Sequence, residues 1–260
     1  MDADMLSGLL RDVRKQVYLA GIFMKNQPLT EITSKQGHAN YVTDMDLKIQ
    51  NRLTDELKEL LPEAEVVAEE SDQNHTGSLS WVIDPIDGTT NYITGYHHSC
   101  ISIGLVEYGE SVLGVVYNPY TDEMFYAARG VGAYMNEIGI RPSRRMKEQA
   151  LVGFGTSPYN SELMDKTFQA AKEMLKSCAD IRRSGSAALD LAYVACGRID
   201  GFFEYTLSPW DYAAGVCIVR EAGGLVSGIG EALSFDRPMG IMAASPAMWK
   251  TLSETVVRYQ

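Results

Sequence analysis

The sequence predicts an α/β protein made of two abutting layered halves. Three observations support this class. The N-terminal part of the 260-residue chain has helical hydrophobic periodicity, the middle has short apolar runs separated by turns, and the rest alternates strand-like with helical segments. The pattern changes near Pro142. We therefore expect an α+β half with an antiparallel sheet over residues 1–142, and an α/β half over residues 143–260.

Two amphipathic helices are predicted in the N-terminal part. Apolar residues recur at helical spacing over residues 4–26, and the polar stretch over residues 27–40 is typical of a loop. Thr43 is suited to cap a second helix, because two aspartates follow in its first turn, where acidic side chains favour the helix dipole. Leucines continue this helix to Pro62.

Short strands are predicted in the middle of the chain. Val66–Ala68 and Trp81–Ile83 are apolar runs, and each ends directly before acidic residues. Residues 99–136 hold four further apolar runs with turn residues between them, which predicts an antiparallel meander.

The C-terminal half alternates between the two kinds of element, as in a sheet covered by helices. The predicted strands are 151–154, 201–205 and 241–244, and the predicted helices are 162–178, 187–196, 210–222 and one that begins at Pro246.

The charge balance argues against several classes of partner. Lys and Arg number 23 while Asp and Glu number 34, so the net charge is −11. This disfavours nucleic acid and anionic membrane surfaces as partners. An anionic substrate would also be repelled, unless cations line its site.

Targeting and redox signals are absent from the sequence. The N-terminus carries acids where a secretory signal needs positive charge, and no apolar run approaches the roughly 18 residues of a membrane span. The four cysteines show no spacing typical of metal ligands. We therefore expect a cytoplasmic protein with buried, reduced thiols.

The densest chemical signal is Trp81–Asn91, where Asp84 and Asp87 follow a buried strand. Pro85 holds Asp84 in an extended conformation, and Gly88 permits a sharp turn and close approach of a ligand to the backbone. The amides after this turn suit an anion, as at a helix N-terminus. Carboxylates beside anion-binding amides are explained if divalent cations lie between them, and such hard oxygen ligands suit Mg²⁺.

Simpler interpretations of this motif exist. An Asp-x-x-Asp-Gly turn in isolation is most often a solvated turn. A calcium loop of the EF-hand type is excluded, because Gly95 stands where that loop needs a glutamate. The Asp-x-Asp-Gly-Thr loop of haloacid-dehalogenase-type phosphatases is nearer, but the spacing of its acids differs from the spacing here.

Two further acidic segments weaken the turn interpretation. Glu69 and Glu70 follow their own strand, and Glu69 would reach the same edge as Asp84 if the two strands are neighbours. Asp211 opens a predicted helix that continues with small residues. Each acid alone is typical of a surface pair or a helix start. Together they place carboxylates at the ends of the predicted central strands.

These segments resemble the signatures of the inositol monophosphatase family. The resemblance rests on Trp81–Tyr92, on Trp210–Gly224, on Glu69–Ser71 and on Val42 and Thr43 with Asp46, and it covers nearly the whole chain. It implies a layered αβαβα sandwich of the inositol monophosphatase and fructose-1,6-bisphosphatase type. It also implies a homodimer.

The resemblance implies two Mg²⁺ ions and a third, weaker one. The first would be held by Glu69, Asp84 and the backbone carbonyl of Ile86, and the second by Asp84, Asp87 and Asp211, with the third near Glu69. Electrostatics agrees with this sharing, because two carboxylates ~4 Å apart repel by about 4 kcal/mol at an effective dielectric constant near 20. Bound metal turns this repulsion into attraction and supplies the positive field that a phosphate needs.

The implied reaction is hydrolysis of a phosphomonoester by in-line attack of water, without a phosphoenzyme. One metal would lower the pKa of the attacking water, and the other would stabilise the leaving alkoxide. Thr89, hydrogen-bonded to Asp46, would orient this water and help to deprotonate it, and Glu69 completes the predicted catalytic set. Without the resemblance, Thr89 would be interpreted as a helix cap and Asp46 as a helix-start acid.

Substrate contacts also follow from the resemblance. Glu204 stands where the family's inositol phosphatases use a glutamate to accept hydrogen bonds from ring hydroxyls, and Thr156 stands where the family often has serine. The amides of Gly88 and Thr89 would hold phosphate oxygens. The predicted substrate contacts are Asp87, Gly88, Thr89, Gly185, Ser186, Ala187, Glu204 and Asp211.

The most specific prediction is hydrolysis of myo-inositol 1-phosphate, with inhibition by lithium. Relatives with the same fold hydrolyse fructose 1,6-bisphosphate, 3′-phosphoadenosine nucleotides, NADP or histidinol phosphate. Glu204 favours a polyol. The signature segments have no cluster of Lys and Arg nearby, which argues against a second phosphate or a nucleotide tail on the substrate. Two other classes stay open: a non-catalytic binding protein on this scaffold, and a subunit whose main role is contact with another protein.

Overall fold

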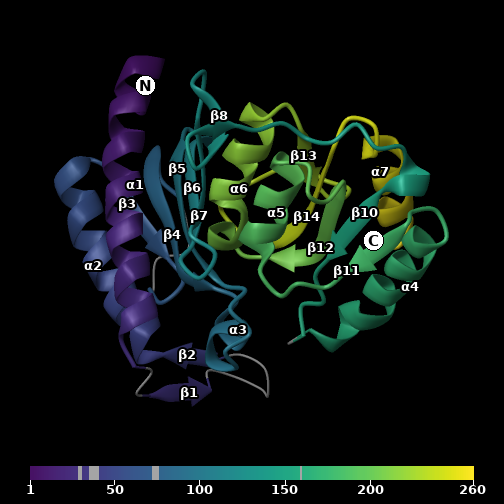
Figure 1. Cartoon of the computed structure of the whole chain (residues 1–260), viewed down its shortest axis with the longest axis horizontal. Coiled ribbons are helices and arrows are strands. Elements are labelled where there is room, and N and C mark those ends of the chain that lie inside the picture. The colour runs from purple at the N-terminus through teal and green to yellow at the C-terminus, as the bar shows by residue number, and fades with distance from the viewer. Residues whose placement is uncertain (29–30, 35–40, 72–75, 159) are drawn as a thin grey trace.

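Two β-sheets alternate with three layers of helices (Figure 1). This computed structural model describes residues 1–28, 31–34, 41–71, 76–158 and 160–260. The predicted αβαβα sandwich is therefore confirmed in its order of layers. The polar stretch predicted as a loop over residues 27–40 lies partly outside the described residues. Within it, the loop prediction is wrong at β1 (Ile32–Ser34), which pairs antiparallel with β2 (Tyr41–Thr43) in a short two-stranded sheet.

The first helical layer is formed by α1 (Ala3–Asn26) and α2 (Asp44–Leu60), which pack together on one face of the larger sheet. The apolar stripe of α1 is buried, because its leucines and valines recur on the face that meets the sheet. The predicted cap of α2 is confirmed. The Thr43 hydroxyl accepts from backbone amides of the first turn, and the Thr43 amide donates to Asp46, so the two form a capping box.

The larger sheet has seven strands in the order β3-β4-β5-β6-β7-β8-β9. β3 is parallel to β4, and every later pairing is antiparallel, which confirms the predicted meander. The strands are β3 (Glu65–Ala68), β4 (Leu79–Asp87), β5 (Cys100–Glu107), β6 (Glu110–Asn118), β7 (Glu123–Ala128), β8 (Gly132–Met135) and β9 (Ile138–Gly139).

β4 is longer than the sequence predicts. Its pairing with β5 continues past Pro85 as far as Asp87, with a register shift between Asp84 and Asp87. The shift explains how a proline is tolerated inside the strand, because proline cannot donate to the ladder and is accommodated at bulges. It also leaves two carboxylates at the end of one strand, before the short helix α3 (Thr89–Ile93).

The middle layer consists of α5 (Ala187–Ala195) and α6 (Pro209–Glu221), which pack between the two sheets. Glycines in the larger sheet make the contact with α6 close. A Cβ added at Gly114 would lie 2.3 Å from the carbonyl oxygen of Ala214, and one added at Gly104 would lie 2.8 Å from the Cβ of Ala213. The small residues after Asp211 therefore let α6 lie directly on the sheet.

The smaller sheet has the strand order β11-β10-β12-β14-β13, and α4 and α7 pack on its other side. The edge strands β11 and β13 are short and were not predicted from the sequence. The elements are β10 (Leu151–Phe154), β11 (Asp180–Arg182), β12 (Gly201–Leu207), β13 (Leu225–Gly228), β14 (Met239–Ala244), α4 (Met164–Leu175), α7 (Trp249–Arg258) and the 3₁₀ turns Lys147–Gln149 and Ser161–Leu163.

Each predicted half contributes one sheet, with strands from residues 65–139 in the larger sheet and from residues 151–244 in the smaller one. Both middle helices come from the second half and pack on the larger sheet as well. The division at residue 142 stays a prediction. In the part of the chain that the structure describes, no helix is long and apolar enough to cross a membrane.

Candidate functional site

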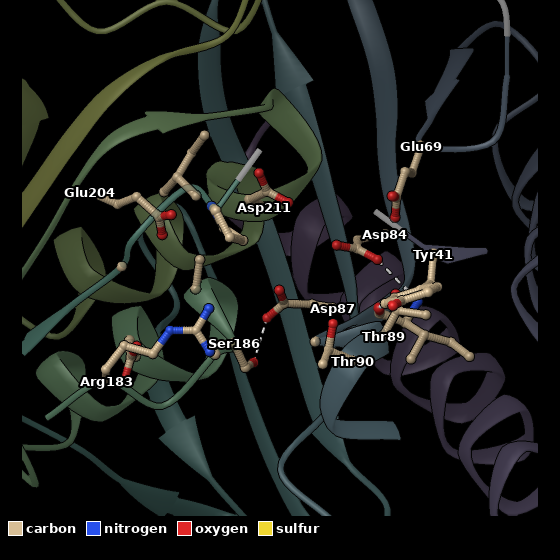
Figure 2. Close-up of a pocket in the computed structure, with 18 residues that line it drawn as sticks. Tyr41, Glu69, Asp84, Asp87, Thr89, Thr90, Arg183, Ser186, Glu204 and Asp211 are labelled. Carbon is tan, nitrogen blue, oxygen red and sulfur yellow. Dashed lines mark hydrogen bonds between the residues drawn. The ribbon is translucent and has the colours of Figure 1, made fainter. Parts of the chain in front are cut away.

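Four acidic residues meet at a cavity of about 290 Å³ between the larger sheet and the middle layer. Asp84 and Asp87 come from the end of β4, Asp211 from the start of α6, and Glu69 directly follows β3 (Figure 2). One carboxylate oxygen from each of the three aspartates lies within 4.8 Å of the others. The structure thus brings together residues that lie far apart in the sequence.

The position of Glu69 follows from the pairing of β3 with β4. The two strands are parallel, with Ala68 opposite Ile83, and the Glu69 amide continues the ladder by donating to the Ile83 carbonyl at 3.2 Å. The chain therefore places Glu69 at the same edge as Asp84, as predicted for neighbouring strands. Figure 2 shows the Glu69 side chain directed toward Asp84.

Helix starts hold the carboxylates in place. Asp211 accepts from the Ser208 amide at 2.7 Å, which forms the capping box of α6. Asp87 accepts from the Ser186 hydroxyl and from the Ala188 amide at 2.9 Å, at the start of α5. Because the N-terminal end of a helix carries partial positive charge, both helices favour the ionised form of the acid that they hold.

Burial and mutual repulsion oppose ionisation. The pKa of Asp84 is raised well above its ordinary value, first by burial and then by the charges of Glu69, Asp87 and Asp211. The pKa of Asp211 is raised by burial and by Asp87 and Glu69. Burial also raises the pKa of Asp87, against the lowering effect of its bond from Ser186.

The donor set fits a hard divalent cation. All candidate ligands are carboxylate or carbonyl oxygens, which Mg²⁺, Ca²⁺ and Mn²⁺ prefer. A cation among Glu69, Asp84, Asp87 and Asp211 would offset the repulsion that raises their pKa values. The acidic cluster is therefore a candidate metal site.

Thr89 and Asp46 lie near this cluster, but their expected hydrogen bond is not among those of the described residues. The Thr89 hydroxyl donates to the Ile86 carbonyl at 3.0 Å instead. One Asp46 oxygen accepts from the Thr43 amide at 2.8 Å, as the capping box of α2 requires. Asp46 is close enough for its charge to raise the pKa of Asp84. The catalytic roles of Thr89 and Asp46 stay predictions.

The turn before α3 has the predicted geometry. Gly88 has a φ of 85° and caps the helix, and a Cβ there would lie 3.1 Å from two carbonyl oxygens. Asn91 on α3 donates to the carbonyls of His98 and Ser184 at 2.7 and 3.0 Å, which ties this turn to the segment before α5. Gly88 and Thr89 therefore line the cavity beside Gly185, Ser186 and Ala187, all of which are predicted substrate contacts.

Glu204 on β12 forms the opposite wall of the cavity. Its Oε1 accepts from both the amide and the hydroxyl of Ser157 at 2.9 Å. Burial raises the pKa of Glu204 to about 7. The residue that supports Glu204 is therefore Ser157, whereas the neighbouring Thr156 hydroxyl accepts from Arg183 at 3.3 Å.

Sequence reasoning missed Asp190 and Arg183, which line the cavity, and Ser157, which holds Glu204. None of the three belongs to a recognised motif, and Arg183 follows another arginine in a polar stretch that is typical of a solvated surface. No cluster of Lys and Arg adjoins the signature segments in the sequence, but folding brings Arg183 to the cavity. The only sequence signal was its closeness to Gly185.

Comparison with known proteins agrees with this architecture. A model of the inositol monophosphatase family matches residues 14–260. A Xylella fastidiosa protein named Nus factor SuhB is 42% identical over 193 residues, which are 74% of this chain and 70% of the relative.

Solved structures agree as well. The extragenic suppressor protein suhB from Bartonella henselae superposes with a TM-score of 0.89 at 32% identity, over 96% of this chain and 98% of that one. The inositol monophosphatase from Anabaena (Nostoc) sp. PCC 7120 superposes with a TM-score of 0.85 at 32% identity, over 97% and 96% of the two chains. The chain belongs to the inositol monophosphatase family.

Proposed function

We propose that this protein is a Mg²⁺-dependent phosphomonoesterase that converts myo-inositol 1-phosphate to myo-inositol and phosphate. The observation that carries the proposal is the meeting of Asp84, Asp87 and Asp211, whose carboxylate oxygens lie within 4.8 Å of one another beside a cavity. Glu204 faces them across that cavity. One wall thus suits a metal and a phosphate, and the other suits an alcohol with hydroxyl groups.

The acidic cluster would hold Mg²⁺ through Glu69, Asp84, Asp87, Asp211 and the carbonyl of Ile86. When bound, the ions supply positive charge for the phosphate and lower the pKa of the attacking water. This answers the electrostatic problem of a chain with a net charge of −11, because the ions attract the anionic substrate.

The chain's own groups position the reactants. We assign Thr89 to orienting the attacking water, with Asp46 behind it, and the amides of Gly88 and Thr89 to the phosphate oxygens. The Thr89 hydroxyl now donates to the Ile86 carbonyl, so it would have to rotate to donate to Asp46, while its oxygen can accept a hydrogen bond from water. Such rotation is an ordinary change for a half-buried hydroxyl.

The choice of an inositol phosphate rests on Glu204. A carboxylate that lines the cavity can accept hydrogen bonds from ring hydroxyls of a polyol. The name of the Anabaena neighbour, inositol monophosphatase, supports the same substrate class. Fructose 1,6-bisphosphate, 3′-phosphoadenosine nucleotides, NADP and histidinol phosphate are the competing substrates within this fold. The proposal also includes inhibition by lithium, a homodimer and a cytoplasmic location, all of which follow from the sequence and its resemblance.

The decisive experiment is phosphate release by the purified protein, with and without Mg²⁺, from these five substrates and glycerol 2-phosphate. We expect Mg²⁺-dependent release with a clear preference for inositol 1-phosphate. Asp87→Asn should abolish turnover and leave the fold intact, whereas Asp44→Asn, which removes a helix-start acid outside the cavity, should retain it. Activity of Asp87→Asn within a few-fold of the wild type would contradict the metal assignment. Preference for another substrate would contradict the choice of inositol 1-phosphate and leave the metal assignment intact.

A second candidate function is contact with another protein. The Xylella relative is named a Nus factor, and this name states no enzymatic activity. If the purified protein with Mg²⁺ releases phosphate from none of the substrates, this candidate, or a non-catalytic binding role, would replace the phosphatase.

A further inference from the structure

The cavity wall opposite the acidic cluster carries a second group of charged side chains. Glu204 comes from β12, Asp190 from α5, and Arg183 from the segment between β11 and α5. Arg183 is the only Lys or Arg among the described residues that line the cavity. Figure 2 shows its guanidinium group directed into the cavity toward Ser186.

Two glycines make room for two of these side chains. A Cβ added at Gly155 would lie 1.7 Å from Oε2 of Glu204. A Cβ added at Gly185, whose φ is +91°, would lie 2.7 Å from Nη1 of Arg183. Such distances are far below van der Waals contact, so any larger residue would displace the side chain beside it. At Gly185 the displaced group would be the flexible end of the exposed Arg183, whereas at Gly155 it would be the buried Glu204 carboxylate, so the backbone of this wall is closely fitted to Glu204.

Each of these charged side chains is fixed by hydrogen bonds at one of its polar atoms, and at least one other polar atom has no hydrogen-bond partner among the described residues. Arg183 Nε donates to Thr156, Glu204 Oε1 accepts from Ser157, and Asp190 Oδ2 accepts from the Ser184 hydroxyl at 2.6 Å. Among the described residues, Nη1 and Nη2 of Arg183, Oε2 of Glu204 and Oδ1 of Asp190 have no hydrogen-bond partner. The cavity lining thus offers both donor and acceptor atoms that have no partner among the described residues.

We propose that Arg183 is a specificity-determining residue, which donates hydrogen bonds to hydroxyl oxygens of the alcohol part of the substrate. A hydroxyl group accepts one hydrogen bond and donates another, so neighbouring hydroxyls of a polyol match a wall on which a guanidinium stands beside carboxylates. This inference rests on the proposed function, because it concerns the alcohol part of the same substrate.

The charge of the wall favours a neutral polyol over a second phosphate. Burial raises the pKa values of both Asp190 and Glu204, and the positive charge of Arg183 only partly opposes this rise. With one acid ionised the charge of Arg183 is neutralised, so a second anionic group would gain no net attraction there, and with both ionised it would meet repulsion. Hydroxyl groups carry no net charge and meet no such repulsion.

The test compares Arg183→Gln with Arg182→Gln. Arg182 is the neighbouring exposed arginine, it pairs with Asp180, and it does not line the cavity. We would measure kcat and KM for inositol 1-phosphate, for inositol 1,4-bisphosphate and for phenyl phosphate, which carries no hydroxyl group on its alcohol part. Arg183→Lys tests whether a single ammonium restores part of the effect.

We expect Arg183→Gln to lower the ratio of kcat/KM for inositol 1-phosphate to that for phenyl phosphate about tenfold, mainly through KM, as for the loss of one charge-assisted hydrogen bond. Phenyl phosphate itself should lose at most about threefold. Arg182→Gln should change neither substrate. Equal losses on both substrates would overturn the inference, as would a loss confined to the bisphosphate, which would make Arg183 an anion-binding residue.

Failure of the proposed function gives a different result. If the protein is not a phosphatase, the wild type itself releases no phosphate from any of the three substrates. Titration calorimetry with inositol 1-phosphate then decides the role of Arg183. Weaker binding by Arg183→Gln than by Arg182→Gln would uphold the inference, and equal binding by the two variants would overturn it.

Discussion

Ser186 donates its hydroxyl hydrogen to Asp87 and accepts from the Leu189 amide as the N-cap of α5. One side chain therefore both starts a helix of the middle layer and fixes an aspartate of the acidic cluster. The bond is buried and joins residues 99 positions apart in the sequence. Helix formation and the geometry of the cluster consequently depend on the same hydroxyl group.

Replacement of Ser186 by alanine should affect both properties. Loss of the cap should lower the free energy of unfolding by about 1 kcal/mol. Loss of the bond to Asp87 should raise the Mg²⁺ concentration for half-maximal activity about tenfold or more, as for other groups that orient metal ligands. Asp2→Ala removes the side-chain cap of α1, which lies far from the cavity, and provides the control. If both variants lose stability and neither changes the Mg²⁺ requirement, Ser186 has no role in the cluster.

Asp84→Asn should make the metal-free protein more stable. Because the pKa of Asp84 is raised above 3.8 in the folded chain, its contribution to stability is complete only below that pH and is lost as the pH rises. At pH 7.5 the substitution removes this penalty and should raise the free energy of unfolding by about 0.5–2 kcal/mol.

Mg²⁺ should reverse this order. A ligand at 100 times its Kd stabilises the wild type by about 2.7 kcal/mol, whereas Asp84→Asn should gain little. Thermal unfolding with EDTA and with Mg²⁺ measures both effects. A wild type that melts at the same temperature under both conditions would show that the acids bind no Mg²⁺.

Glu204→Gln should change the pH dependence of stability. Burial raises the pKa of Glu204 from 4.5 to about 7, so its contribution to stability is complete below pH 4.5 and is lost as the pH rises through 7. Glutamine does not titrate, and its side-chain oxygen can still accept both bonds from Ser157. Relative to the wild type, the variant should gain about 3 kcal/mol between pH 4.5 and pH 8. Urea unfolding across this range measures the gain, with the exposed Glu254→Gln as the control. Parallel profiles for all three proteins would exclude the raised pKa.

Gly155→Ala should selectively impair use of a polyol substrate. The added methyl group would overlap the Glu204 carboxylate, which must then move from its place in the wall. The expected result is the one that Glu204→Gln should also give, namely a larger fall of kcat/KM for inositol 1-phosphate than for phenyl phosphate. Gly8→Ala in α1 adds the same methyl group where no atom lies within 4 Å, and should leave both rates unchanged. Equal falls on both substrates would remove Glu204 from substrate recognition.

The sequence predicted most elements because their signals are local. The helix cap at Thr43, the apolar face of α1 and the antiparallel meander each depend on residues close together in the sequence. The structure has all three at the predicted positions. The strand end at Ile83 was wrong by four residues. A proline usually ends a strand, and only the bulge opposite β5 allows the pairing to resume beyond it.

The candidate site was predictable where acids end strands, and only there. Glu69 and Asp84 could be paired from the sequence because two strands of similar character end beside them. Asp211 was singled out because it opens a predicted helix, but only the family resemblance assigned it to the same metal ion as Asp84. Arg183 and Asp190 could not be found, because their place depends on how α5 packs between the sheets.

The close approach of α6 to Gly104 and Gly114 has a consequence for quality control. Asp211 lies on α6, and the two glycines allow this helix to pack closely on the larger sheet. A misfolded copy in which α6 stands farther from the sheet cannot bring Asp211 to Asp84 and Asp87. Incompletely folded copies would still carry every acidic side chain, yet their carboxylates would not lie close enough together to bind a metal ion. Metal binding at this cluster would then report that α6 has packed fully onto the larger sheet.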